Sequence, residues 1–360
     1  MFPAIVSFVL MLLAIYLLAI ITDEFFIESL EEIAKLWKLP DNVAGASLMA
    51  MGSSMPELSI ALIALVSEDG AHSEVGIGTI VGSAVFNILV ITGASALVRP
   101  ATISWKVILR DCLFYTISIF LLLGVYRDGQ VVIAEALVFL ALYTVYIIVL
   151  FQWNRFFPEE TESEDLIEMV EKEIEAGLVD GSIYQLVTRG IGNIIRLLTG
   201  PPRKSFVRAF LVSVLLIAAL SYVLVENAVV FASAIGVPPL LIALTILAGG
   251  SSVPDLIASM LVSKEGKGDM AITNAVGSNI FDIAIGLGVP WLIVLLVGGS
   301  AIPVGTEGLY ESTLILLGTV VILFLFLTIG KQLSRFEGAV LLVIYVVYVV
   351  WVWMSAGGQG

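Results

Sequence analysis

Long apolar segments, separated by short polar turns, dominate this chain of 360 residues. Ten of them can cross about 30 Å of hydrocarbon, at about 2–22, 43–66, 75–98, 106–125, 131–151, 207–225, 238–262, 270–297, 312–330 and 338–354. With 59% hydrophobic and 13% charged residues, such a chain cannot fold as a water-soluble globule. The sequence therefore predicts an all-α polytopic membrane protein with ten transmembrane helices in a lipid bilayer.

A polar insert at 152–206 divides these segments into two sets of five, at 1–151 and 207–360. Ten of the 31 acidic residues lie between Glu159 and Asp180, so the net charge of −14 says little about the membrane part. An apolar stripe in this acidic segment predicts a helix against the cytoplasmic face, formed by Leu166, Ile167, Val170 and Ile174. A regulatory Ca²⁺ sensor is the alternative, although no EF-hand pattern occurs. Nucleic acid is not an expected partner.

Basic residues favour one side of the predicted membrane. Alternate turns on that side hold sixteen Lys and Arg residues, whereas the other side holds only Arg127. Since Lys and Arg accumulate in cytoplasmic loops, we expect both termini outside and the insert in the cytoplasm. The first segment has neither a basic leader nor a small-residue cleavage site, so we expect it to be retained. The predicted location is the plasma membrane.

Two motifs occur twice, five predicted spans apart. GSSMPEL at Gly52–Leu58 matches GSSVPDL at Gly250–Leu256, and VGSAVFNI at 81–88 matches VGSNIFDI at 276–283. An odd number of spans between copies reverses the second copy relative to the first. The repeated segments, at about 43–98 and 238–297, therefore predict two inverted five-helix repeats, as in secondary transporters whose site lies near the membrane midplane.

Three carboxylates lie well inside predicted spans: Glu57, Asp255 and Asp282. Each charged group costs about 2.5–3.5 kcal/mol at the centre of a membrane helix. We expect no Lys, Arg or His at comparable depth. Protons or imported cations should therefore compensate the charge.

Oxygen donors accompany these acids at helical spacing. Residues four apart share a helix face, which gives the pairs Ser53 with Glu57, Ser83 with Asn87, Ser251 with Asp255, and Ser278 with Asp282. Hard oxygen ligands suit Ca²⁺ and alkali cations, whereas Mg²⁺ keeps its waters and transition metals prefer His or Cys. The lone Cys112 and lone His72 form neither a disulfide nor a zinc cluster.

A proline precedes the carboxylate in both copies of the first motif. Pro56 and Pro254 have no N–H, so each should break its helix and leave the carbonyl of Gly52 or Gly250 without an intrahelical donor. Broken backbone at membrane depth is tolerated where it lines a cavity. We therefore expect both glycine carbonyls to be available as ligands, and both glycines to allow close approach of ions and helices.

The motifs MGSSMPEL with GIGTIVGSAVFNI, and GGSSVPDLIAS with GDMAITNAVGSNIFDIAIGLGVPW, resemble the two repeats of the calcium/cation antiporter superfamily. The similarity is strongest to potassium-dependent sodium/calcium exchangers, and covers nearly all of the chain except the insert. It implies that Glu57 and Asp255 bind Ca²⁺ and Na⁺ in alternation, with Asn87 and Asp282 completing the middle of the site. It also implies hydroxyl ligands for Na⁺ from Ser53, Ser54, Ser83, Ser251, Ser252 and Ser278.

The resemblance implies an antiporter that extrudes Ca²⁺ in exchange for Na⁺, and that is not an enzyme. Aspartate at position 282 is typical of the members that co-transport K⁺, which favours K⁺ here. A K⁺-independent exchanger and a proton/calcium exchanger remain alternatives. An intramembrane protease is disfavoured, because Asp269 of its GxGD-like string, Gly266–Asp269, falls in a charged turn. A calcium channel is disfavoured by the inverted repeat. We expect no prosthetic group, and no protein partner can be inferred.

Overall fold

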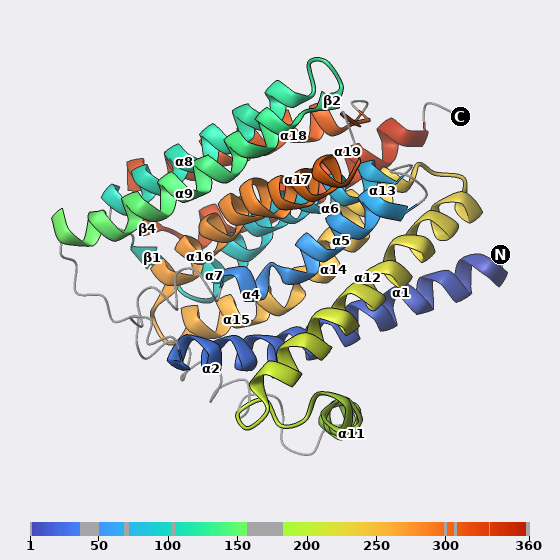
Figure 1. The fold of residues 1–360 in the computed structure, drawn as a ribbon. Helices are drawn as coiled ribbons and strands as arrows, with labels where there is room; N and C mark the ends of the chain where they lie inside the picture. The colour runs from blue at the N-terminus through green and yellow to red at the C-terminus, as the bar shows by residue number, and fades with distance from the viewer. Residues whose placement is uncertain are drawn as a thin grey trace.

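The chain forms a bundle of membrane-length helices in a computed structural model (Figure 1). The structure describes residues 2–36, 50–67, 72–102, 105–156, 183–298, 301–305, 308–330 and 332–357. The acidic helix predicted between Glu159 and Asp180 lies outside these ranges. The predicted three-part division at 151/152 and 206/207 stays a prediction.

The first half contains α1 (Phe2–Ile21), the π-helical turn η1 (Thr22–Ile27), α2 (Glu28–Leu36), α4 (Ala50–Ser53), α5 (Met55–Val66), α6 (Ser73–Phe86), η4 (Asn87–Ile91), α7 (Thr92–Val98), α8 (Trp105–Val125) and α9 (Ile133–Phe156). After α11 (Ile183–Thr199), the second half contains α12 (Phe206–Ile235), α13 (Pro239–Ile242), η5 (Ala243–Leu247), α14 (Ala248–Ser251), α15 (Val253–Lys264), α16 (Gly268–Phe281), η6 (Asp282–Leu287), α17 (Gly288–Val297), α18 (Leu309–Gly330) and α19 (Arg335–Gly357).

Eight helices in the described ranges are long and apolar enough to cross a membrane. A ninth is obtained if Pro239–Ser251 and Val253–Lys264 count as one span bent by 44°. The remaining predicted span, 43–66, is described only from Ala50 onward, and its helix Met55–Val66 has 12 residues. The observed architecture is therefore helical with eight to nine candidate spans, and the ten-helix arrangement stays a prediction.

Two helices are longer than predicted. The first runs without interruption over the 35 residues Phe2–Leu36, and α12 runs over 30 residues. Their predicted ends, at 22 and 225, each lie just before a charged residue. A charged side chain does not by itself end a helix. Asn227 donates a hydrogen bond to the Val223 carbonyl within α12 at 2.7 Å, and the helix ends only at Gly236, whose φ of 76° is left-handed.

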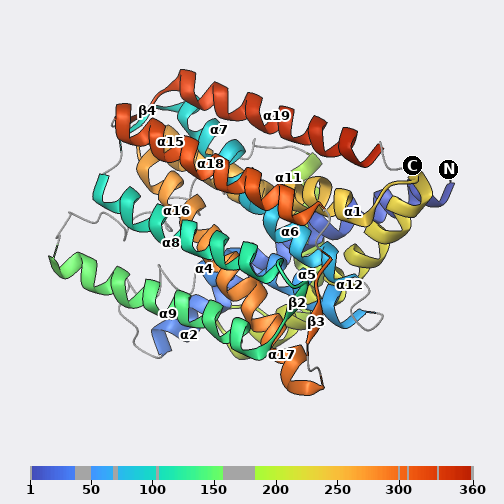
Figure 2. The ribbon, with the colours of Figure 1, turned by 90° about the horizontal axis from the view of Figure 1, so that it is seen from above.

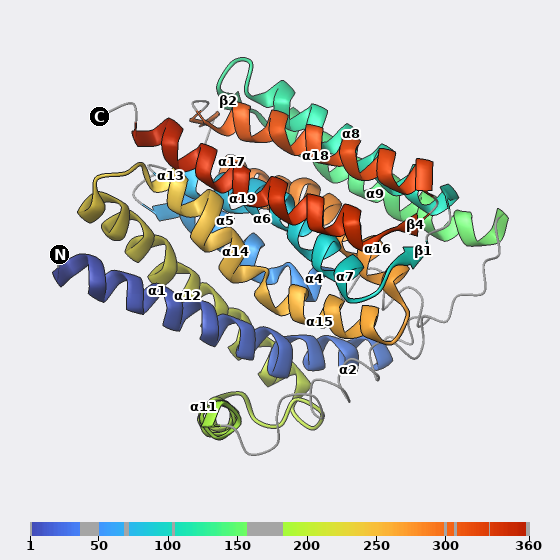
Figure 3. The ribbon, with the colours of Figure 1, turned by 180° about the vertical axis from the view of Figure 1, so that it is seen from behind.

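The helices divide into a buried centre and a lipid-facing periphery. In the span Ser73–Val98, 94% of the most apolar window is buried, compared with 17% in Ile133–Trp153. The central layer combines α5 and α6 with α14, α15 and α16, all of which carry the repeated motifs. On one flank α1 and α12 lie side by side, as Figure 3 shows from behind. The repeated motifs therefore meet in the middle of the bundle.

Short strands tie the loops together at opposite ends of the bundle (Figure 2). β1 (Ala101–Thr102) pairs antiparallel with β4 (Gln332–Leu333), and β2 (Gln130–Val131) pairs antiparallel with β3 (Ile302–Pro303). Each pair joins a loop of the first half to a loop of the second. The two halves are therefore fastened to each other at both ends.

Glycine lets the two repeated segments touch in the centre. A Cβ at Gly82 would lie 2.5 Å from the Leu244 carbonyl oxygen, so only glycine fits against that backbone without a shift. A Cβ at Gly277, the matching position of the second copy, would meet only the Tyr146 hydroxyl at 3.8 Å. The close packing at this motif position is therefore one-sided.

We expect Gly82→Ala to lower the thermal unfolding temperature of the detergent-purified protein, because overpacking of this kind costs about 1–3 kcal/mol. Gly277→Ala is the matched control and should unfold near the wild-type temperature, since its new methyl group makes only an ordinary contact. Equal unfolding temperatures for the two variants, measured by intrinsic fluorescence, would contradict this packing asymmetry.

Candidate cation-binding site

Both helices that carry the Gly-Ser-Ser motif are broken at the second serine. Ser54 has φ −89° and ψ 6°, and Ser252 has φ −91° and ψ 1°. These values lie in the sparsely allowed bridge region, where many active-site residues sit. Pro56 and Pro254 then occupy the first turn of the following helix, where a missing N–H costs nothing. The proline-dependent break is therefore confirmed in both copies.

Acceptor oxygens in the centre of the bundle lack hydrogen-bond partners. Glu57 is 3% exposed, Asn87 1% and Asp282 1%. Glu57 Oε2, Asn87 Oδ1 and Asp282 Oδ1 are each buried without a partner. Buried acceptors normally find donors, so three orphans from both repeats indicate a missing electropositive group. Asp255 is only partly buried and lies at the edge of this group.

The three carboxylates act on one another electrostatically. Glu57 lies within electrostatic range of both Asp255 and Asp282. Within the described residues, no group of three or more His, Cys, Asp or Glu side chains is spaced to hold a metal ion by itself. Hydroxyl and amide oxygens would have to complete any coordination.

Serine hydroxyls pair across the two repeats in a symmetric manner. Ser54 Oγ lies 3.3 Å from Ser278 Oγ, and Ser83 Oγ lies 2.9 Å from Ser252 Oγ. All four side chains are buried. Each contact joins a broken helix of one repeat to the VGS motif of the other. Four of the predicted hydroxyl ligands therefore lie together, and they contact one another in pairs.

The remaining predicted ligands, Ser53, Ser251, Gly52 and Gly250, lie nearer the flank of α1. Ser251 Oγ donates to the Ala248 carbonyl of its own helix at 3.3 Å. The Gly250 carbonyl accepts the Ser252 N–H, a donor from the break itself, while Pro254 supplies none. The helix break turns the chain back sharply enough to supply a nearby N–H. Close approach at the glycines is confirmed: a Cβ would lie 2.7 Å from Ile27 at Gly52, and 2.5 Å from Ile15 at Gly250.

A buried amide that sequence reasoning missed holds Asn87 in place. Asn279 Oδ1 accepts a hydrogen bond from Asn87 Nδ2 at 2.9 Å. Asn279 Nδ2 donates to the Ala84 carbonyl at 3.1 Å and to the Tyr115 hydroxyl at 2.9 Å. Because Asn279 engages the amide nitrogen of Asn87, the Oδ1 atom of Asn87 remains without a partner. The available signal was the mismatch within the repeat, where Asn279 stands opposite Ala84.

Comparison with known proteins agrees with this geometry. The sequence profile of the sodium/calcium exchanger protein family matches residues 6–152 and 205–354. The chain belongs to the sodium/calcium exchanger family. The unmatched stretch between the two matches coincides with the predicted insert, and the family resemblance inferred from the motifs is confirmed.

Among curated relatives, this exchanger-family chain is 28% identical to human sodium/potassium/calcium exchanger 4, covering 92% of this chain and 78% of that protein. It is 30% identical to human sodium/potassium/calcium exchanger 5, covering 95% and 81% respectively. Both relatives are named as exchangers of sodium, potassium and calcium, so they are transporters.

Two solved structures share the fold of this exchanger-family chain. The H⁺/Ca²⁺ exchanger CAX superposes with a TM-score of 0.70 at 16% identity, covering 97% of this chain and 82% of that one. The sodium-calcium exchanger NCX_Mj, soaked with 2.5 mM Na⁺ and 10 mM Sr²⁺, superposes with a TM-score of 0.54 at 21% identity, covering 96% and 99%. At these identities the likeness concerns the fold.

One buried ion pair lies near the start of α8 in this family member. Arg110 is 6% exposed within α8, and it holds the neighbouring Asp111 through two contacts of 2.7 and 3.0 Å. The Tyr146 hydroxyl also donates to Asp111, and the Arg110 guanidinium lies 5.6 Å from the centre of the Trp153 ring. Arg110 therefore neutralises its neighbour, while the charges that act on Asp282 are those of Glu57 and Asp255.

We expect Asn279→Ala to destabilise the protein, because it leaves the buried groups of Asn87, Ala84 and Tyr115 without a partner, at about 1–3 kcal/mol for each lost bond. Tyr115→Phe, which removes only one of these bonds, is the graded control and should lower the unfolding temperature less. Thermal unfolding in detergent measures both. A larger loss in Tyr115→Phe than in Asn279→Ala would contradict the central position of Asn279.

Proposed function

We propose that this protein is an antiporter that extrudes Ca²⁺ in exchange for Na⁺ by alternating access, with K⁺ co-transported. The observation that carries the proposal is the set of three orphaned, buried oxygens on Glu57, Asn87 and Asp282. An unpaired buried carboxylate is costly, and a bound cation removes that cost. Ca²⁺, Na⁺ and K⁺ are here the substrates.

Charge balance explains why exchange is obligatory in this proposal. The three carboxylates Glu57, Asp255 and Asp282 are neutralised by one Ca²⁺ with one K⁺, and equally by three Na⁺. A neutral loaded site can move between access states, whereas an empty site with several negative charges stays in place. Because both loads carry three positive charges, the exchange moves no net charge, and the inward Na⁺ concentration gradient sets its direction.

We propose residue roles that follow the two repeats. Glu57 and Asp255 are the central Ca²⁺ carboxylates, which Na⁺ uses in alternation, and Asn87 and Asp282 complete the middle. The Gly52 and Gly250 carbonyls lie beside this centre. Hydroxyls flank it as Na⁺ ligands, from Ser53, Ser54, Ser83, Ser251, Ser252 and Ser278. The hydroxyl contacts across the repeats support this assignment.

We also propose ten spans in two inverted halves, with both termini outside, the insert in the cytoplasm, and the whole chain in the plasma membrane. The matching helix breaks at Ser54 and Ser252 support the repeat. The two strand pairs also support the repeat. Exchanging the halves replaces β1 by β3 and β4 by β2, so the pair β1–β4 becomes the pair β3–β2. The long neighbours α1 and α12, which occupy equivalent places, are the natural moving elements.

A proton/calcium exchanger is the second candidate. The fold likeness to CAX favours it, and protonation would also neutralise Asp282. The paired hydroxyls and the sodium/potassium/calcium exchangers among the relatives favour Na⁺. A K⁺-independent sodium/calcium exchanger differs only in the occupant of the Asp282 region.

Ion flux in proteoliposomes separates these candidates. We expect an imposed Na⁺ gradient to drive ⁴⁵Ca²⁺ uptake against its gradient, and we expect Glu57→Gln to abolish that uptake because one central carboxylate is lost. A pH gradient alone should drive little uptake. Uptake that follows the pH gradient and ignores Na⁺ would overturn the proposal in favour of proton exchange.

Asp282→Asn tests the K⁺ role. We expect this variant to retain Na⁺-driven Ca²⁺ flux and to lose its dependence on K⁺, since the amide preserves shape and removes one negative charge. The measurement is the initial rate of ⁴⁵Ca²⁺ uptake as the K⁺ concentration is varied at constant ionic strength. K⁺ dependence that survives in the variant would remove Asp282 from this role.

A further inference from the structure

A pocket lies between the first helix and both broken helices. Five α1 and η1 residues at helical spacing form one wall: Ile15, Leu18, Ala19, Thr22 and Asp23. The opposite wall is formed by the two Ser-x-x-Pro segments, through Ser53, Pro56, Ser251, Pro254 and Asp255. The cavity volume is about 20 Å³, enough for a single water molecule or a bare ion. It therefore borders the proposed site directly, on the flank that α1 covers.

The polar end of this wall is held in position by packing on either side. Ile15 fills the space above Gly250, and Ile27 fills the space above Gly52. Thr22 and Asp23 lie between these two contacts, in the π-helical turn η1. Single π-helical turns occur frequently at functional sites. These two contacts flank the oxygen-bearing side chains of Thr22 and Asp23 on the pocket wall.

Thr22 has an oxygen with no partner. Its side chain is 3% exposed and lines the pocket, and its Oγ1 is buried without a hydrogen bond. A buried hydroxyl in this condition indicates an absent ligand or water. Its neighbour Asp23 adds a carboxylate within electrostatic range of Asp255.

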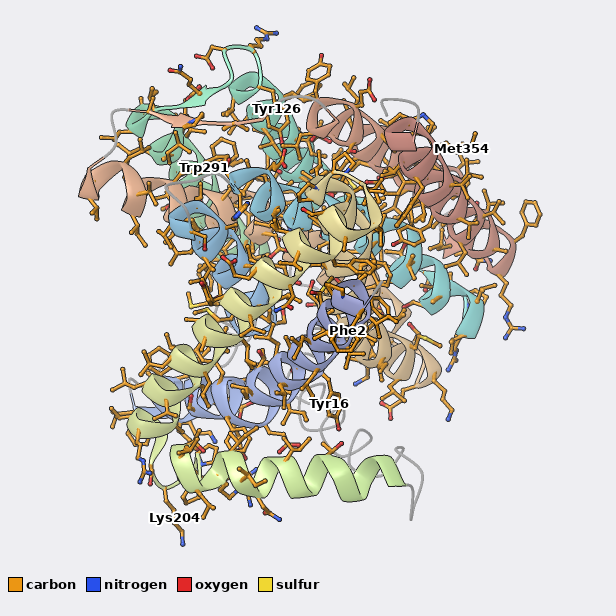
Figure 4. All side chains as sticks on the ribbon, turned by 90° about the vertical axis from the view of Figure 1, so that its right-hand side faces the viewer. Phe2, Tyr16, Tyr126, Lys204, Trp291 and Met354 are labelled. Atoms are coloured by element: carbon orange, nitrogen blue, oxygen red, sulfur yellow. The ribbon has the colours of Figure 1, made fainter. Side chains whose placement is uncertain are left out.

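The two adjacent acids of η1 have different surroundings. Glu24 is turned toward α11, where its Oε2 would lie 2.9 Å from a Cβ at Gly192, and the charge of Arg196 acts on it. Asp23 instead lines the pocket. The acids Glu24 and Asp255 lie within electrostatic range of it. Figure 4 shows α11 running across the flank below the first helix. Asp23 therefore places a carboxyl group at the pocket, whereas the carboxyl group of Glu24 is directed toward α11.

We infer that Thr22 and Asp23 form a recruiting site for Ca²⁺ at the cytoplasmic mouth of the transport site. This inference rests on the proposed function and on the proposed orientation, in which the chain runs inward from η1 into α2. A carboxylate, a hydroxyl and retained waters bind Ca²⁺ weakly, and Asp255 with Ser251 stands on the opposite wall. Weak binding suits a transit station, because the ion must enter readily and also leave.

The test compares Asp23→Asn and Thr22→Val with the matched control Glu24→Gln, which removes a charge one position away. ⁴⁵Ca²⁺ flux is measured with Ca²⁺ presented to the cytoplasmic face in inside-out vesicles, and to the outer face in right-side-out vesicles. We expect Asp23→Asn to raise the half-saturating Ca²⁺ concentration at the cytoplasmic face about tenfold. The maximal rate, and the half-saturating concentration at the outer face, should stay near the wild-type values.

Three outcomes would overturn the inference. These are an unchanged half-saturating concentration in Asp23→Asn, an equal rise in Glu24→Gln, and an equal rise at both membrane faces. A rise in Thr22→Val that persists at high ionic strength supports direct contact with the ion, since long-range steering is screened by salt.

A second measurement separates this inference from the proposed function. Equilibrium binding of ⁴⁵Ca²⁺ to detergent-purified Glu57→Gln should show residual weak binding, and the double variant with Asp23→Asn should lose it. Binding that is the same in both proteins would overturn the recruiting site, whatever ion drives transport. Absence of Na⁺-driven flux in wild-type vesicles, with this Asp23-dependent binding retained, would count against the proposed function alone.

Discussion

Uncompensated negative charge in an apolar interior is the constraint on which the structure depends. Removing a carboxylate from water is expensive, and the expense is recovered only by a partner of opposite charge or by several donors. Arg110 and Asp111 satisfy this requirement within α8 itself. Glu57 and Asp282 do not, since each keeps a buried oxygen without a partner. The first arrangement is complete in the protein alone, whereas in the second the proposed transported cation would supply the missing partner.

The two halves of the chain share the site in a way that neither half could achieve alone. Ser54 contacts Ser278 and Ser83 contacts Ser252, so both of these serine pairs cross from one repeat to the other. The π-helical turns η4 and η6 start at Asn87 and Asp282, the matching positions of the second motif. The symmetry is incomplete, because Asn279 has no polar counterpart at Ala84. Relative motion of the halves would therefore change several of these contacts together.

The first helix contacts both the candidate cation-binding site and α11. It packs on Gly52 and Gly250 through isoleucine side chains, and the Tyr16 hydroxyl lies 2.6 Å from Thr188 Oγ1 of α11. Arg203 pairs with Glu28 at 3.0 Å, and Arg208 donates to the last carbonyls of α11. These contacts link the insert to α1 and α12. A displacement of either helix would therefore disturb its contacts with α11.

Sequence alone determined the membrane environment, the duplicated motifs and the helix breaks, and it singled out the acids Glu57, Asp255 and Asp282 as candidates. These features depend on hydropathy along the chain and on covalent properties such as the missing N–H of proline. Tertiary structure decided the helix ends, the serine pairs across the repeats, the role of Asn279 and the pairing of Arg110 with Asp111. It also decided that Gly250 keeps a hydrogen-bond donor and that Gly82, but not Gly277, is needed for close approach. The physical reason is that a side chain's partner depends on which helices face each other, and that information is not contained in the spacing within one helix.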